Sequence, residues 1–253
     1  SVFFIILVIL TSGFKGFYSL VGLLFSFAVI FAFMVPLILR GAGPVGIGVS
    51  SAALILMPTL YLSYGLNKKS IATFLGIIIA LLFVGVTSNY FVGALQFTGL
   101  GEISMFLDME TSNSINLISL IIVGIIIAAV GVLDDVAAIQ SSVVFSLASA
   151  NTNLRGFKLF KEAMHVGRDH ISAVVNTLVL AYTGASLPLI LLLSLRGMSV
   201  DYFINIEMVA EEITRTLISS SGLLLAVPLT TLIAVILASE NHQKYKTICN
   251  TSG

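Results

Sequence analysis

Charged residues are scarce in this chain, and their scarcity excludes a soluble globular protein. Asp, Glu, Lys and Arg make up 9% of the 253 residues, whereas 58% are hydrophobic and the mean hydropathy is +1.10. Soluble domains carry roughly 25% charged residues. Twelve basic residues balance twelve acidic ones, so no surplus of positive charge is available for binding nucleic acid.

Cysteine and catalytic motifs are equally sparse. The single cysteine, Cys249, excludes an internal disulfide. No Ser-His-Asp set, Cys-His pair or H-E-x-x-H motif occurs, so we expect no enzyme. His165, Asp169 and His170 are too few ligands for a metal site and fit a solvated segment better.

Long apolar runs dominate the chain instead. A run of about 20 apolar residues crosses the hydrocarbon core of a bilayer as a helix, and the alternating pattern of a β-barrel is absent. The sequence predicts an all-α polytopic transmembrane bundle with six full spans and, at Ser1–Thr11, the remainder of a truncated N-terminal span rather than a signal peptide. The six predicted spans are Phe17–Leu39, Val45–Tyr64, Ile71–Leu95, Ile115–Ala150, Ile171–Leu195 and Ile213–Ala238.

Lys and Arg fall mainly in alternate loops, which fixes the predicted orientation. Cytoplasmic loops are enriched in these residues, and one assignment places nine of them inside and two, Arg40 and Arg196, outside, with Arg215 left at the outer mouth. We therefore expect a cytoplasmic C-terminus. The nine are Lys15, Lys68, Lys69, Arg155, Lys158, Lys161, Arg168, Lys244 and Lys246.

This orientation divides the chain into one integral membrane domain, 1–253, with three polar segments. We expect an extracytoplasmic acidic loop at 96–114, a cytoplasmic amphipathic connector at 151–170 and a cytoplasmic tail at 239–253. The connector separates Leu154, Phe157, Phe160 and Met164 from its charged residues, a pattern typical of a helix at the membrane interface.

Small and polar residues recur every three or four positions in the last three spans, and such a stripe lets helix backbones approach closely in lipid. We expect all three stripes to face the bundle interior, whereas the aromatic and aliphatic span Phe17–Leu39 is expected to face lipid. The stripes are Gly124, Ala128, Gly131, Asp135, Ala138, Ser142, Ser146 and Ser149; then Asp169, Ala173, Thr177, Ala181 and Gly184, with Asn176 beside them; then Glu212, Thr216, Ser219, Gly222, Ala226, Thr230 and Ala234.

Two adjacent carboxylates, Asp134 and Asp135, interrupt the apolar run Ile115–Ala150. A charge at membrane depth is costly and marks a functional site by default. We expect Arg168 to pair with one aspartate, leaving the other to bind a cation or a proton. The predicted intramembrane polar site is Asp134, Asp135, Arg168, Asp169, Asn176 and Thr177. Two alternatives stay open: the pair ends a span at the headgroup level, or forms a structural salt bridge.

A second charged cluster is Glu211, Glu212 and Arg215, whose i,i+3 and i,i+4 spacing favours ion pairs along one helix face. We place it at the outer mouth, either as a surface pair or at a gate. The segment Gly41–Gly48 matches the dinucleotide motif G-x-G-x-x-G, but it lies between two membrane spans and lacks the acidic residue about twenty positions later. A tight turn between helices explains its glycines, and we expect no cofactor.

Four segments resemble the YibE/F family of bacterial multi-pass membrane proteins: Gly131–Val136, Lys158–Asp169, Asn176–Leu193 and Ala210–Ala234. The resemblance implies a multi-pass protein of the bacterial cytoplasmic membrane, acting as a homo-oligomer or beside a related partner subunit. It marks Gly167, Arg168, Asp169, Asn176 and Thr177 as motif positions. The family pattern usually carries one aspartate where this chain has Asp134 and Asp135, and it often reads Ser-Gly-Met-Asn where this chain has Glu162–His165. The larger family members also have an extracytoplasmic N-terminal domain, which we expect this chain to lack. It implies no established activity.

The sequence thus favours a permease-like or channel-like protein for a small solute or ion, with a path between the last three spans past Asp134, Asp135, Arg168, Asp169 and Asn176. The competing interpretation is a membrane receptor, assembly factor or regulatory subunit that transports nothing. A polar cavity that reaches the aspartates would favour transport.

Overall fold

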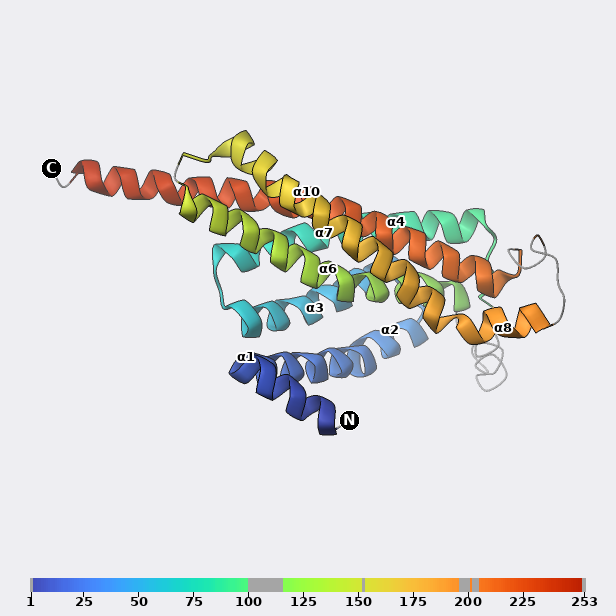
Figure 1. The fold of residues 1–253 in the computed structure, drawn as a ribbon. Coiled ribbons are helices and arrows are strands. Elements are labelled where there is room, and N and C mark those ends of the chain that lie inside the picture. The colour runs from blue at the N-terminus through green and yellow to red at the C-terminus, as the bar shows by residue number, and fades with distance from the viewer. Residues whose placement is uncertain (1, 100–115, 152, 196–200, 202–204, 252–253) are drawn as a thin grey trace.

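The chain is helical in the computed structural model, which describes residues 2–99, 116–151, 153–195, 201 and 205–251, with no side chains for 2, 4, 15, 189, 192, 193 and 240–251. The helices lie side by side in an elongated bundle (Figure 1). They are α1 (Val2–Val29), the π-helix η1 (Ile30–Met34), α2 (Val35–Leu39), α3 (Pro44–Tyr64), α4 (Lys68–Ala94), α6 (Leu117–Ala150), α7 (Gly156–Ala185), α8 (Leu187–Leu195) and α10 (Glu207–Thr251).

Five helical segments in the described residues are long and apolar enough to cross a membrane, so the predicted count of six full spans is not confirmed. The predicted span Ile171–Leu195 is divided between α7 and α8, because the helix is interrupted at Ser186, just before Pro188. The five segments are Gly16–Leu39, Pro44–Tyr64, Lys68–Ala94, Leu117–Ala150 and Glu207–Ser239.

The polar segments predicted at 96–114, 151–170 and 239–253 have different outcomes. Most of the acidic loop lies outside the described residues. Residues 156–170 of the connector form the first half of α7, where Leu159 and Ala163 are buried while Phe157 is 80% exposed. The tail continues α10 to Thr251.

The N-terminal helices form the loosest part of the bundle. The apolar helix Ile5–Phe14 meets the span Gly16–Leu39 at a kink, where Gly13 has a φ of 59° that favours glycine. Only 17% of the apolar window in Gly16–Leu39 is buried, as expected for a lipid-facing segment. A π-helical turn at η1 precedes Pro36, and Gly41, with a φ of 72°, makes the turn into α3.

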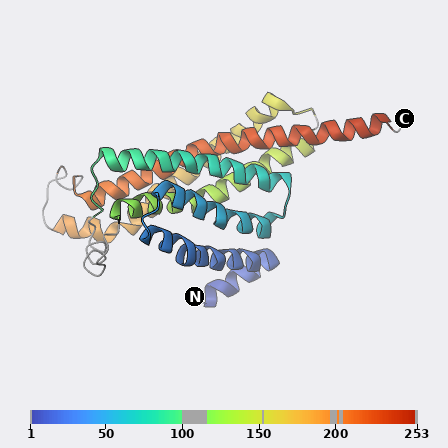
Figure 2. The same cartoon turned by 180° about the vertical axis from the view of Figure 1, so that it is seen from behind.

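Helix α6 lies at the centre and packs against α3, α4, α7 and α10. Seen from behind, α10, α4, α3 and α1 follow one another across the bundle (Figure 2). Glycines allow close packing, because a Cβ at Gly76 would collide with Thr230 and one at Gly222 with Val84. Large aliphatic side chains of α6, such as Ile125 and Leu133, fill the core between these helices.

The three small-residue stripes do not all face inward. The α10 stripe does, since Ser219, Ala226, Thr230 and Ala234 are buried. The prediction is wrong for half of the α6 stripe, where Gly131, Asp135, Ser146 and Ser149 are exposed, because the large aliphatic face of α6 occupies the core instead. It is also wrong for α7, whose stripe Asp169, Ala173, Thr177, Ala181 and Gly184 is exposed.

Candidate functional site

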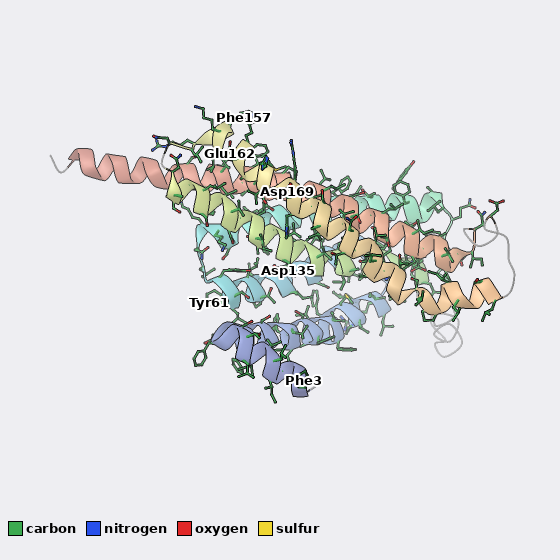
Figure 3. All side chains as sticks on the ribbon, in the orientation of Figure 1. Phe3, Tyr61, Asp135, Phe157, Glu162 and Asp169 are labelled. Carbon is green, nitrogen blue, oxygen red and sulfur yellow. The ribbon has the colours of Figure 1, made fainter. Side chains whose placement is uncertain are left out.

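Asp134 and Asp135 lie in the middle of α6 and line a pocket of about 280 Å³ between α1, α3 and α6. Figure 3 places Asp135 on the α3 side of α6, with Asp169 on α7. Asp134 is half-buried and its Oδ1 atom is fully buried with no hydrogen-bond partner, whereas Asp135 is exposed. The other lining residues are Tyr18, Ser19, Gly22, Leu23 and Ser26 from α1, and Thr59, Leu60, Ser63 and Tyr64 from α3.

Hydroxyl groups make up most of the polar lining beside the carboxylates. Ser26 Oγ donates to the Gly22 carbonyl at 2.9 Å, and Thr59 Oγ1 donates to the Ile55 carbonyl at 2.9 Å. Because the protons of these two hydroxyls are used within their own helices, their oxygen lone pairs remain free to accept. The pocket therefore presents acceptor oxygens and negative charge.

Among the side chains that the structure describes, no basic one lines this pocket. The predicted ion pair between Arg168 and an aspartate is absent from the described part of the chain. Arg168 is exposed and lines a separate hollow with Lys161 and His165. The reason is geometric: α7 meets α6 through Gly167 and Gln140, and six residues separate Gln140 from Asp134, a turn of about 120° around α6.

The six residues of the predicted polar site thus form two groups. Asp134 and Asp135 share the pocket, while Arg168, Asp169, Asn176 and Thr177 are exposed on α7. The predicted path between the last three spans passes none of the pocket's α1 and α3 residues. The small-residue stripes did not indicate the serine and threonine hydroxyls of α1 and α3 that line the pocket.

A sequence signal for these hydroxyls does exist. Ser19 and Ser26 are seven residues apart, two helical turns, and Thr59 and Ser63 are four apart, so each pair lies on one helix face. Serine and threonine are common in membrane helices because they bond to their own backbone. The spacing of these serines and threonines indicates a site only when α1 and α3 are known to face the two aspartates.

The depth of the pocket follows from the contact between α6 and α4. Ser141 Oγ donates to the Lys69 carbonyl at 3.0 Å, in the first turn of α4. Asp134 precedes Ser141 by seven residues, so it lies about 10 Å farther along α6, towards the other end of the bundle. Lys69 Nζ lies 4.8 Å from the centre of the Tyr64 ring, which borders the pocket. The carboxylates are therefore inside the span and within reach of its basic end.

The second predicted cluster forms as its spacing indicates. Arg215 Nη2 donates to Glu211 Oε1 at 2.8 Å, and Arg215 Nε lies 3.6 Å from Glu212 Oε2. Arg215 also reaches α6, since a Cβ at Gly124 would lie 3.8 Å from its Nη1. The cluster is half-buried and its charges pair within α10, so it has the geometry of a local ion-pair network.

A metal site and a nucleotide site gain no support from the geometry. Among the described residues, no three His, Cys, Asp or Glu side chains gather closely enough to hold a metal ion. Gly41–Gly48 runs from the end of α2 into α3 and follows a helix rather than the strand that the dinucleotide motif requires.

The model of the family described as YibE/F-like protein matches residues 1–240. The chain belongs to this family. Together with the five apolar helices, the match makes it a multi-pass integral membrane protein. No curated protein and no solved structure matches the chain.

The motif positions that resemble the family occupy two environments in this structure. Gly167 is buried, where a Cβ would lie 2.8 Å from Val227 and 3.0 Å from Gln140. Arg168, Asp169 and Asn176 are exposed on the same helix. Gly167 is thus explained by packing within the chain, and the polar positions that follow it are not.

Proposed function

We propose that the chain transports a small cation, with Asp134 and Asp135 as the binding groups of the pocket between α1, α3 and α6. The single observation that carries the proposal is the composition of the pocket: two carboxylates and a set of hydroxyl oxygens, with no basic residue among the described side chains of the lining. Such a lining attracts cations and repels anions.

The electrostatics of the span favour a bound cation or proton. A carboxylate in a medium of low dielectric is strongly destabilised unless an opposite charge neutralises it. Asp134 Oδ1 is buried without any hydrogen bond, and Arg168, the partner predicted from the sequence, lies elsewhere. A positive ion in the pocket would supply the missing partner.

The oxygen-only chemistry of the lining narrows the class of substrate. Carboxylate, hydroxyl and phenol oxygens suit protons and hard cations such as Na⁺, K⁺, Mg²⁺ or Ca²⁺, whereas Zn²⁺ and copper ions favour nitrogen and sulfur ligands. The described residues of the lining include no histidine, cysteine or methionine. We therefore place the substrate among hard cations and protons.

Helix α1 is suited to open and close this pocket. It is attached chiefly to α3, where Gly22 lies so close to Thr59 that a Cβ would approach its Cγ2 to 3.2 Å. Most of its other side chains are exposed, and the π-turn η1 follows it. Because α1 supplies one wall, sliding α1 on α3 would uncover the half-buried Asp134 without disturbing the core around α6.

The test is transport by the purified protein in liposomes. Proton flux is followed with a trapped pH-sensitive dye, and uptake of Na⁺, K⁺, Mg²⁺ and Ca²⁺ is followed with ion-selective dyes. We expect flux of at least one cation, reduced about tenfold or more in Asp134→Asn and Asp135→Asn, because each removes a charge from the site. Glu162→Gln is the matched control, since Glu162 is an exposed acid on α7 outside the pocket.

Two results would contradict the proposal. If both Asn variants match the unmodified protein in every flux assay, the pocket is not the transport site. If cations bind at the pocket without any flux, the chain belongs to the competing class of receptors and regulatory subunits.

A further inference from the structure

A second hollow, of about 390 Å³, lies along the first half of α7. It shares none of its described lining residues with the pocket of Asp134 and Asp135. Three apolar and three nitrogen-bearing side chains line it, and no carboxylate is among the described ones: Phe157, Phe160 and Met164, then Lys161, His165 and Arg168. The hollow therefore combines an apolar surface with positive charge.

The spacing of these residues puts apolar and cationic groups on one face of α7. Four of them are separated by four, three and four residues and form a stripe along the helix: Phe157, Lys161, Met164 and Arg168. The acids of this half of α7, Glu162 and Asp169, each follow a cationic stripe residue in the chain, so they lie about 100° around the helix from it. Aromatic, cationic, apolar and cationic groups thus succeed one another along the stripe.

The hollow extends from one end of the bundle into the span. Near its start, Leu159 packs in one buried cluster with Ala72 of α4 and Val235 of α10, so this part of α7 lies beside the beginning of α4. Figure 1 shows α7 starting at the end of the bundle from which α10 continues. Arg168, at the other end of the hollow, follows Leu159 by nine residues and lies about 14 Å deeper. Because Val235 belongs to the span Glu207–Ser239, the hollow runs beside a membrane-spanning helix.

Lipid is the neighbour that this position selects. Phe157 is 80% exposed, and its ring stacks on that of Phe160 with 6.3 Å between the centroids. Exposed phenylalanine beside basic residues is typical of a helix face that lies in the membrane interface. Side chains on a helix lean toward its N-terminus, and long basic side chains extend along apolar surface to reach the headgroups. Since α7 begins at the basic end of the bundle, Lys161 and Arg168 lean toward the headgroups of that leaflet.

We propose that this hollow binds an anionic phospholipid of the leaflet at the basic end of the bundle, which the distribution of Lys and Arg predicts to be the cytoplasmic one. The lipid phosphate accepts hydrogen bonds from Lys161 and Arg168, as in other basic pockets beside membrane helices. The glycerol and the first acyl carbons pack on Phe157, Phe160 and Met164. A soluble phosphate compound would leave the apolar half uncovered, and an uncharged lipid would leave the cations unpaired.

Native mass spectrometry of the full chain, released from detergent micelles, measures this preference for the first lipid bound. Phosphatidylglycerol, with one net negative charge, and phosphatidylcholine, with none, are added separately with the same acyl chains. A basic side chain near an anionic surface contributes about fivefold in affinity, so two should give phosphatidylglycerol about 20- to 30-fold tighter binding. We expect Lys161→Gln and Arg168→Gln each to lower this ratio about fivefold, and the double variant to bind both lipids alike.

Lys158→Gln is the matched control. Lys158 is exposed on the same half of α7 but is not among the described residues that line the hollow. Its replacement should leave the ratio within about twofold, because solvent screens an exposed charge outside the site. If Lys158→Gln lowers the ratio as much as Lys161→Gln does, the attraction belongs to the surface as a whole and the site is wrong. Equal affinity of the unmodified protein for the two lipids would also overturn it.

Competition with glycerophosphoglycerol distinguishes a lipid site from a site for soluble phosphate compounds. This molecule is the headgroup of phosphatidylglycerol without acyl chains, so it cannot cover Phe157 and Met164. We expect an equal concentration of it to displace no phosphatidylglycerol, and displacement would contradict a lipid site. Because the hollow and the cation pocket have no described lining residue in common, cation flux tests the transport proposal independently.

Discussion

Two polar regions of α6 lie within two helical turns of each other and differ in whether their buried polar atoms have hydrogen-bond partners. At the first, the junction of α6, α7 and α10, Gln140 is 1% exposed and donates to the Ala163 carbonyl at 3.0 Å and to Thr231 Oγ1 at 2.8 Å. At the second, the carboxylate pocket, Asp134 Oδ1 is buried with no partner beside a cavity of about 280 Å³.

The difference teaches how to interpret a polar residue inside a membrane bundle. At the junction, both donor hydrogens of the Gln140 amide are used and Gly167 fills the remaining space, so the group holds three helices together. In the pocket, Asp134 Oδ1 is buried without a hydrogen-bond partner, which costs stability unless a ligand supplies one. The first arrangement is complete, whereas the second leaves a buried carboxylate oxygen without a partner, which under the transport proposal a bound cation supplies.

The largest effect is expected from crowding the junction. In Gly167→Leu, the first added atom already lies 2.8 Å from Val227 Cγ1 and 3.0 Å from the Gln140 amide, which is held by two hydrogen bonds. Overpacking of this kind costs about 3 kcal/mol. We expect a matching loss of unfolding free energy, measured by reversible unfolding in bicelles.

Gly131→Leu is the control for this prediction. Gly131 is also a helical glycine, on α6, and a Cβ there meets nothing within 4 Å. Its replacement should be neutral or slightly stabilising, because glycine is the poorer helix former by about 1 kcal/mol. Equal losses in the two variants would show that the junction is not tightly packed.

The helical fold could be predicted from the sequence, but the arrangement of the helices around Asp134 and Asp135 could not. Length and hydropathy suffice for helices such as α4 and α6, because lipid demands about 20 apolar residues. The interrupted helix at Ser186 was missed, since the apolar run continues through it from Ile171 to Leu195.

The direction in which the small-residue stripes face was predicted correctly for α10, for only half of the stripe on α6, and incorrectly for α7, and the reason is physical. In lipid, an aliphatic side chain gains little by turning inward, so the apolar pattern does not separate core from periphery. On α6, Ile125 and Leu133 turn to the core while Gly131 and Asp135 turn away. The Arg168 pairing failed for the same reason: the sequence does not show which side of α6 meets α7.

A smaller effect is expected when the junction loses its hydrogen bonds but keeps its volume. Gln140→Leu leaves the Ala163 carbonyl without the amide donor and removes the link to Thr231. Each buried polar group that loses its partner costs about 1 to 3 kcal/mol. We expect about 2 kcal/mol less unfolding free energy, and Gln140→Glu should not restore it, because a carboxylate lacks the donor hydrogens. A Leu variant as stable as the unmodified protein would remove the contrast between the two regions.

The smallest change in stability is expected at Asp134, although it is the more strongly polar residue. Asp134→Asn breaks no hydrogen bond of Oδ1, because none exists in this structure, and it removes a charge from a site of low dielectric. We expect unfolding free energy in the absence of cations to stay the same or to rise by about 1 kcal/mol, while transport falls. Unfolding and flux measured on the same preparation separate the two effects. If Asp134→Asn loses as much stability as Gln140→Leu, the carboxylate is a structural partner like the amide, and the pocket no longer differs from the junction.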